Sequence, residues 1–110
     1  MSTVDSVLFI PTALTPEILP GKLLMRRVGE YEVLLCKFGD SYYAIENRCS
    51  HMGKPLVNGR LLGSSITCPV HSASFDVRNG NALGFPATRA IRRFRIHVDG
   101  DVLSVANRPE

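Results

Sequence analysis

Two short cysteine and histidine pairs near the middle of this 110-residue chain set the strongest limit on what it can fold into. The first pair is Cys49 and His51, and the second pair is Cys68 and His71. Each pair offers one thiolate and one imidazole, a set that suits zinc or an iron–sulfur cluster. We therefore expect the fold to bring the two loops together around a metal group.

Residues around the four candidate ligands match one family as well as the ligands do. The further matches are Gly53 after the first histidine, Pro69 after the second cysteine, Phe75 and Asp76 a few residues past His71, and the loop Gly84, Phe85, Pro86 and Ala87. With these neighbours, the pattern resembles the Rieske [2Fe–2S] family, and the likeness continues through Arg92 to Val105.

The resemblance implies a ligand set and a fold. In such sites two thiolates hold one iron and two imidazoles hold the other. Cys49 and Cys68 would then hold the inner iron, and His51 and His71 the outer, more exposed iron, of one Rieske-type [2Fe–2S] cluster per chain. The implied class is all-β, a Rieske fold with a basal antiparallel barrel or sandwich and an inserted cluster-binding subdomain over about residues 47–86. At this length we expect residues 1–110 to form a single Rieske domain.

A structural zinc ion is the alternative for the same four residues. Zinc modules more often pair cysteine with cysteine and histidine with histidine, so the mixed pairs favour the iron–sulfur interpretation. A zinc-stabilised interaction module stays open as a function from a different class.

The rest of the chain predicts β-structure. Apolar and alternating runs bounded by glycine and proline turns are typical of short strands. The expected strands cover residues 6–10, 22–28, 32–38, 41–46, 61–66, 74–77, 92–98 and 102–105. Between the first two, Thr15-Pro16-Glu17 predicts a helix start with Thr15 as the cap.

Three further residues have roles that the pattern suggests. Cys36 lies in an apolar run, where a buried and inert thiol is expected. His97 is expected to face solvent on its strand, because Phe94 and Ile96 alternate with it. Ser72 stands where the family usually has glycine, so either its hydroxyl bonds locally or the backbone there does not need a positive φ.

Positive charge is concentrated around the ligands. The chain carries +3 overall, but residues 47–98 carry +7 and the remainder carries −4. The segment holds a single acidic residue, Asp76, against eight basic residues: Arg48, Lys54, Arg60, Arg78, Arg89, Arg92, Arg93 and Arg95. Such a charge could steer an acidic partner, or could simply be a solvated surface. Nucleic acid is excluded as a partner, because no aromatic platform or recognition helix accompanies the arginines.

The small size of the chain indicates an electron carrier. It leaves no room for a substrate pocket or a second iron site, so we expect an electron-transfer component and not an enzyme. The resemblance implies a ferredoxin that takes single electrons from a flavoprotein reductase and passes them to a terminal oxygenase, usually in an aromatic-ring-hydroxylating dioxygenase system. The alternative is the small subunit of an assimilatory nitrite reductase.

The sequence also predicts the cellular compartment, the oligomeric state and the reduction potential. Three cysteines, no membrane-spanning run and no leader pattern predict a cytoplasmic protein, expected as a monomer. High-potential relatives carry two extra cysteines and two hydroxyl groups near the cluster. Those positions here hold Lys54, Val70, Ala73 and Phe75, which predicts a potential at the low end of the Rieske range.

Overall fold

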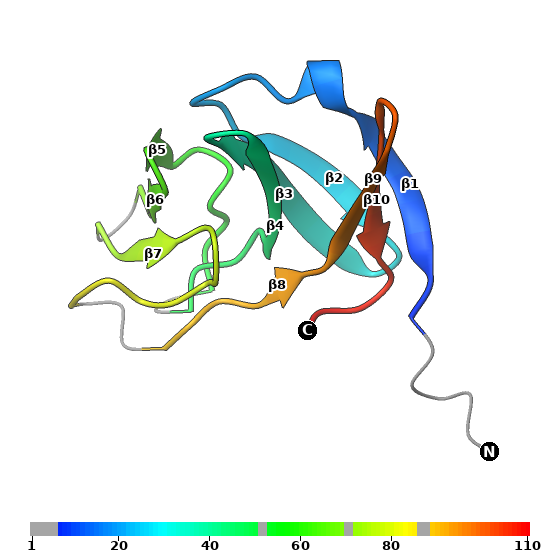
Figure 1. The fold of residues 1–110 in the computed structure, drawn as a ribbon. Helices are drawn as coiled ribbons and strands as arrows, with labels where there is room; N and C mark the ends of the chain where they lie inside the picture. The colour runs from blue at the N-terminus through cyan, green and yellow to red at the C-terminus, as the bar shows by residue number, and fades with distance from the viewer. Residues whose placement is uncertain (1–6, 51–52, 70–71, 86–88) are drawn as a thin grey trace.

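The computed structural model describes residues 7–50, 53–69, 72–85 and 89–110 (Figure 1). These residues form strands in three antiparallel sheets and one 3-10 turn, Thr15–Glu17. The predicted all-β class is therefore confirmed. None of the helices in the described residues is long and apolar enough to cross a membrane.

The terminal sheet joins the two ends of the described chain. It has the order β1-β10-β9 and consists of β1 (Phe9–Leu14), β10 (Val102–Ala106) and β9 (Ile96–Asp99). The prediction that the first strand ends at Pro11 is wrong, because β1 runs through it. Proline is tolerated there because β1 is an edge strand, and the register shifts between Pro11 and Ala13.

The central sheet has the order β2-β3-β4-β8. Its strands are β2 (Leu24–Val28), β3 (Tyr31–Phe38), β4 (Ser41–Glu46) and β8 (Arg93–Phe94). The second and third expected strands are confirmed and form the β2 and β3 hairpin, and the predicted strand 41–46 coincides with β4. A glycine with positive φ turns the chain between β2 and β3 and again between β3 and β4.

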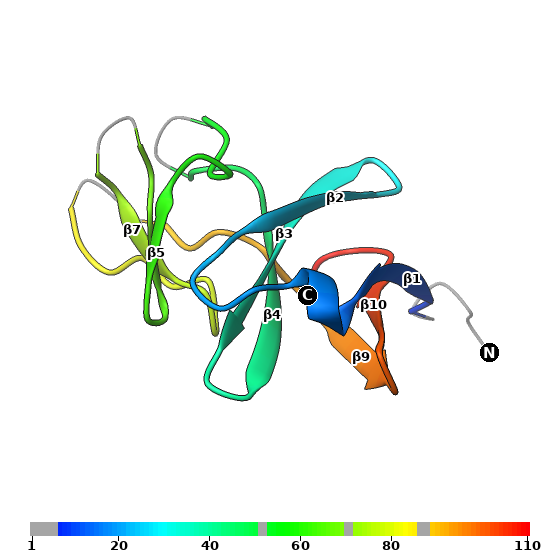
Figure 2. The same cartoon turned by 90° about the horizontal axis from the view of Figure 1, so that it is seen from above.

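The central sheet separates two cores. Along β3, Val33, Leu34, Leu35 and Cys36 are all fully buried, although alternate side chains point to opposite faces. Val33 and Leu35 pack with residues of the terminal sheet, whereas Leu34 and Cys36 pack with residues of the segment 47–91. This segment contains the candidate ligands, and we call it the ligand-bearing half. Figures 1 and 2 show this order, with the central sheet between the terminal sheet and the small sheet.

The small sheet lies between β4 and β8 in the chain. It is formed by β5 (Arg60–Leu62), β6 (Ser65–Thr67) and β7 (Ser74–Asp76), in that order. The prediction of one strand over 61–66 is wrong, because Gly63 adopts φ 58° and folds the segment into a hairpin. The segment still leads into Cys68, as expected.

Two other local predictions are corrected. The expected strand 92–98 is divided between β8 of the central sheet and β9 of the terminal sheet, because the chain changes sheets at Arg95. Thr15 does not cap the short helical turn; instead the Glu17 carboxylate accepts the backbone N–H of Leu14 at 2.7 Å. The exposed position predicted for His97 is confirmed, with its ring 6.1 Å from that of Phe9.

Candidate functional site

The two predicted ligand loops share one backbone design. In the first loop the N–H of Cys49 donates to the Lys54 carbonyl at 2.7 Å, and the N–H of Gly53 donates back to the Cys49 carbonyl at 2.7 Å. The second loop repeats this with Cys68, because its N–H donates to Ala73 at 2.7 Å and its carbonyl accepts from Ser72 at 3.1 Å. Each cysteine is therefore fixed by backbone hydrogen bonds to the residues four and five positions after it.

The fourth residue after each cysteine has a positive φ. Gly53 adopts φ 70° and Ser72 adopts φ 61°, and Ser72 is the one non-glycine residue with positive φ in the described chain. The suggestion that the backbone at Ser72 does not need a positive φ is therefore wrong. The turn needs it, and serine bears the strain that glycine avoids at the matching position.

Both candidate thiolate ligands are buried and free of disulfides. Cys49 and Cys68 are 1% and 2% exposed, and they belong to one core with Leu56 and Phe75. The histidine ligands predicted beside them, His51 and His71, lie outside the described residues.

Cys36 shares that core but differs chemically. It is buried as predicted, and desolvation raises the pKa of its thiol to about 12. A thiol held neutral in this way is unreactive at neutral pH, which agrees with the inert role expected for it.

Asn47 anchors the first ligand loop to the central sheet. Its side-chain carbonyl accepts the backbone N–H of Leu56 at 2.7 Å, and its amide donates to the Glu32 carboxylate at 3.1 Å. Its own N–H donates to the Glu32 carbonyl at 2.8 Å. Asn47 is 7% exposed and its bond to Leu56 is buried, so that bond is shielded from water, whereas the bond to the Glu32 side chain is partly buried. The sequence contains no signal for this role beyond the position of Asn47 two residues before Cys49.

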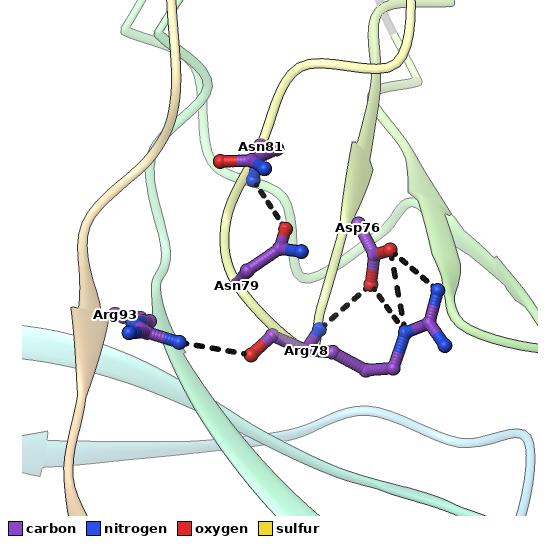
Figure 3. Close-up of polar contacts among 5 residues, drawn as sticks. All are labelled: Asp76, Arg78, Asn79, Asn81 and Arg93. Carbon is purple, nitrogen blue, oxygen red and sulfur yellow. Dashed lines mark hydrogen bonds and ion pairs between the residues drawn. The ribbon is translucent and has the colours of Figure 1, made fainter.

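Asp76 anchors the other side of the small sheet (Figure 3). Its carboxylate accepts bonds from the Arg78 backbone at 2.9 Å and from the Arg78 guanidinium at 2.8 Å. These bonds hold the pKa of Asp76 below its ordinary value, although burial opposes the shift. The following turn brings Asn79 against Asn81, and Arg93 donates to the Arg78 carbonyl at 3.3 Å (Figure 3). The end of β7 is thus tied to β8.

A third segment contacts the first ligand loop. The Ser50 hydroxyl donates to the Arg89 carbonyl at 2.6 Å, and the Arg89 guanidinium donates to the Ser50 carbonyl at 3.2 Å. This segment follows the loop over residues 84–87 that matches the family, of which Pro86 and Ala87 lie outside the described residues. The described residue Phe85 is 92% exposed.

A polar cleft of about 680 Å³ opens beside the first ligand loop. Its lining includes Cys49, Ser50 and Gly53 together with three arginines and one carboxylate: Arg48, Arg89, Arg92 and Glu46. We name this feature the arginine cleft. It places positive charge directly beside a candidate ligand.

The donor set fits an iron–sulfur group. Two buried cysteines, neither of them in a disulfide, occupy the same position in two loops of like design, and each loop carries one histidine in its sequence. Soft thiolates in an apolar core, together with imidazoles, are the ligands that a mixed cysteine and histidine cluster requires.

Comparison with known proteins agrees with this chemistry. The family model described as "Rieske [2Fe-2S] domain" matches residues 9–95. The ferredoxin component of biphenyl 2,3-dioxygenase from Rhodococcus jostii (strain RHA1) is 33% identical over 85 residues, which cover 77% of this chain and 79% of that protein.

Solved structures give the same result. The ferredoxin of carbazole 1,9a-dioxygenase from Nocardioides aromaticivorans IC177 is 34% identical, with a TM-score of 0.84 over 88% of this chain and 95% of that one. A chain from a complex of reduced oxygenase and oxidized ferredoxin in carbazole 1,9a-dioxygenase is 28% identical, with a TM-score of 0.86 over 93% and 95% of the two chains.

Two more distant similarities concern other protein classes. The chain is 28% identical to part of apoptosis-inducing factor 3 from Mus musculus, but the match spans only 14% of that protein. A structure titled as a putative nitrite reductase small subunit is 17% identical, with a TM-score of 0.75 over 89% of this chain and 97% of that one. At that identity the likeness extends to the fold alone.

Proposed function

The chain belongs to the Rieske [2Fe–2S] family, and we propose that it serves as the ferredoxin component of an aromatic-ring dioxygenase system. It is an electron carrier and not itself an enzyme. The observation that carries the proposal is the pair of matched ligand loops, each fixing one buried cysteine, in a chain whose relatives are dioxygenase ferredoxins.

We assign the cluster ligands as Cys49, His51, Cys68 and His71, with one Rieske-type cluster in each chain. When bound, such a cluster accepts and releases one electron at a time. The chain's own residues bury the two thiolates and fix both loops by backbone hydrogen bonds. Fixed loops keep the geometry similar in both oxidation states, which favours rapid transfer.

The partners follow from the proposed role. A terminal oxygenase would receive the electron, as in the complex named for the carbazole relative, and a flavoprotein reductase would supply it. We further propose that residues 1–110 form one domain, that the ligand-bearing subdomain covers about residues 47–86, and that the protein acts as a cytoplasmic monomer. The fully buried Ala73 and Phe75 have no hydroxyl to offer a ligand sulfur, which supports a low reduction potential.

Electron paramagnetic resonance of the dithionite-reduced protein, followed by a redox titration, tests the assignment. A rhombic signal with an average g below that of an all-thiolate cluster, and a midpoint near the low end of about −150 mV, are expected. A colourless protein with stoichiometric zinc would instead support the interaction module.

Substitution tests each histidine separately. His51→Cys or His71→Cys should move the midpoint toward the roughly −400 mV of all-thiolate ferredoxins. His97→Gln is the matched control, because His97 is exposed on the terminal sheet. An unchanged midpoint in either cysteine variant would remove that histidine from the ligand set.

A further inference from the structure

The arginine cleft has more positive charge than its own residues neutralise, and we propose that it is the docking site for carboxylates on an acidic surface of the electron-transfer partner. The proposal rests on the electron-carrier function and adds the chemistry by which the partner is recognised. It identifies one specific site within the positively charged segment of residues 47–98.

Positive charges outnumber negative charges in the lining of the cleft. Among the described residues of the lining, Glu46 is the one carboxylate, and its ion pair with the Arg92 guanidinium is long, at 3.8 Å. Within the described residues, neither Arg48 nor Arg89 makes an ion pair with a carboxylate. The lining side chains therefore carry a net positive charge, and all three arginines are exposed to an incoming partner.

Arginines elsewhere near the ligands differ in this respect. Arg78 is paired with Asp76 at 2.8 Å, and Arg93 is paired with Glu110 at 3.1 Å. Their charge is compensated locally and contributes less to attraction at a distance. Within the lining of the cleft, by contrast, Arg48 and Arg89 have no carboxylate partner among the described residues and place uncompensated charge beside Cys49.

Two of the guanidiniums already lie against the first ligand loop. A Cβ atom at Gly53 would lie 3.4 Å from Nε and Nη2 of Arg48, so this guanidinium packs over the first ligand loop. The Arg89 guanidinium donates to the Ser50 carbonyl of the same loop. Binding to side chains that are already ordered loses less conformational entropy, which favours recognition by bidentate carboxylate contacts.

The cleft lies directly against the first ligand loop. It includes Cys49 and Ser50 in its lining, so a carboxylate bound there would bring the partner surface against the first ligand loop. The chain also has a charge asymmetry, with +7 in residues 47–98 and −4 elsewhere. An acidic partner is therefore attracted to this face in preference to the remainder of the molecule.

Two small oxidants of opposite charge test the site without the natural partner. In each reaction the reduced holoprotein loses one electron, and hexacyanoferrate(III) becomes hexacyanoferrate(II) or hexaammineruthenium(III) becomes hexaammineruthenium(II). The variant Arg48→Gln with Arg92→Gln removes two cleft charges. The matched control, Arg60→Gln with Arg95→Gln, removes two exposed charges that are not in the lining.

Stopped-flow rates at low ionic strength should separate these variants. Oxidation by hexacyanoferrate(III) should slow about tenfold in the cleft variant and no more than about twofold in the control. Oxidation by hexaammineruthenium(III) should not slow in either. Equal slowing by hexacyanoferrate(III) in both variants would mean that only net charge matters, which would overturn the proposal.

An oligoglutamate peptide tests the carboxylate chemistry directly. The peptide should inhibit hexacyanoferrate(III) oxidation of the wild-type and control proteins, and should not inhibit the cleft variant. Inorganic phosphate at the same ionic strength should inhibit far less. Inhibition by phosphate as strong as by the peptide would identify a site for small oxyanions and overturn the docking proposal.

Cluster content separates this proposal from the proposed function. The visible and electron paramagnetic resonance spectra of the cleft variant should equal those of the wild type. If the double variant does not retain the cluster, Arg48→Gln alone gives the same test with about threefold slowing expected. A wild-type protein without a cluster would refute both proposals, whereas normal spectra with no charge preference would refute the docking site alone.

Discussion

The central sheet and the small sheet are both antiparallel, but they are held together differently. The main central strands have five, eight and six residues, and the two longer ones, β3 and β4, carry buried apolar side chains on both faces. Each strand of the small sheet has three residues, and buried polar anchors at Asn47 and Asp76 fix its surroundings. Burial of apolar side chains stabilises a sheet without any ligand, whereas three-residue strands and short loops give little stability by themselves.

The two regions therefore gain their stability from different sources. The terminal and central sheets should persist without a cluster, because the core between them contains neither candidate cysteine ligand. The ligand-bearing half includes Cys49 and Cys68 in its core, so its packing and its metal group should depend on each other. Four experiments can break or sharpen this contrast.

Removal of the cluster should have the largest effect. Cys68→Ser should abolish hydrogen-exchange protection in β5, β6 and β7, while β3 and β10 keep most of theirs. Hydrogen exchange measured by mass spectrometry on the variant and the wild type checks this result. Cys36→Ser is the control, since Cys36 is buried but is not a proposed ligand. Loss of protection in all three sheets would show that the terminal and central sheets have no stability that is independent of the cluster.

Two adjacent leucines on β3 divide the regions more finely. Leu34 packs in the core of the ligand-bearing half and Leu35 packs in the core of the terminal sheet. Replacing either with alanine should cost about 3 kcal/mol of local packing. Leu34→Ala should speed loss of the visible cluster absorbance at constant temperature. Leu35→Ala should lower the melting temperature followed by circular dichroism, with little change in cluster loss. Identical behaviour in both assays would contradict the division.

Asp76 should make the ligand-bearing half sensitive to acid. Because Arg78 lowers the folded-state pKa of Asp76, the stabilising effect is complete above the unfolded value of about 3.9. It is lost as the pH falls through the lower folded value. Asp76→Asn should cost about 1 kcal/mol at pH 7, since the Arg78 side chain is half exposed and screened.

The measurement for Asp76 is the rate of absorbance loss between pH 7 and pH 3. The variant should lose its cluster faster than the wild type at pH 7, and the two rates should converge at the acid end. Asp99→Asn is the control, because Asp99 is an exposed carboxylate on the terminal sheet. A difference that persists unchanged at pH 3 would rule out titration of Asp76.

The smallest effects should come from the paired turns of the ligand loops. Ser72→Gly should stabilise the cluster-bound protein by about 1 kcal/mol, because glycine adopts φ 61° without strain. Gly53→Ala should destabilise by at least that amount, since the new methyl group meets a positive φ and the Arg48 guanidinium. Chemical denaturation of both variants checks the opposite signs, and equal signs would show that the loops are not equivalent.

Sequence predicted the fold where local patterns decide the structure. Tyr31–Phe38 and Ser41–Glu46 were predictable because apolar runs and glycine turns define them. The prediction of one strand over 92–98 was wrong because alternation continues through Arg95, where the chain changes sheets. Only the tertiary arrangement determines that change.

The site shows the same limit. The four predicted ligands follow from residue type and spacing, and their ligation remains a prediction. The local pattern around Gly59 indicates only a turn, yet a Cβ there would clash with the Thr67 carbonyl oxygen. Likewise, the hydrogen bonds of Asn47 depend on Glu32, which is fifteen residues away. Such roles depend on neighbours that become adjacent only on folding.

One feature of the central sheet has a consequence for protein engineering. The ligand-bearing half leaves the sheet after β4 and returns at β8, where the N–H of Glu46 donates to the Arg92 carbonyl at 2.9 Å. Entry and exit are thus a single ladder position apart. Residues 47–91 could be excised and replaced by a tight turn, or transplanted between two neighbouring strands of another protein. The segment is therefore connected through one pair of adjacent strand ends, and a host sheet would also have to supply the apolar face of Leu34 and Cys36 and the Glu32 carboxylate that binds Asn47.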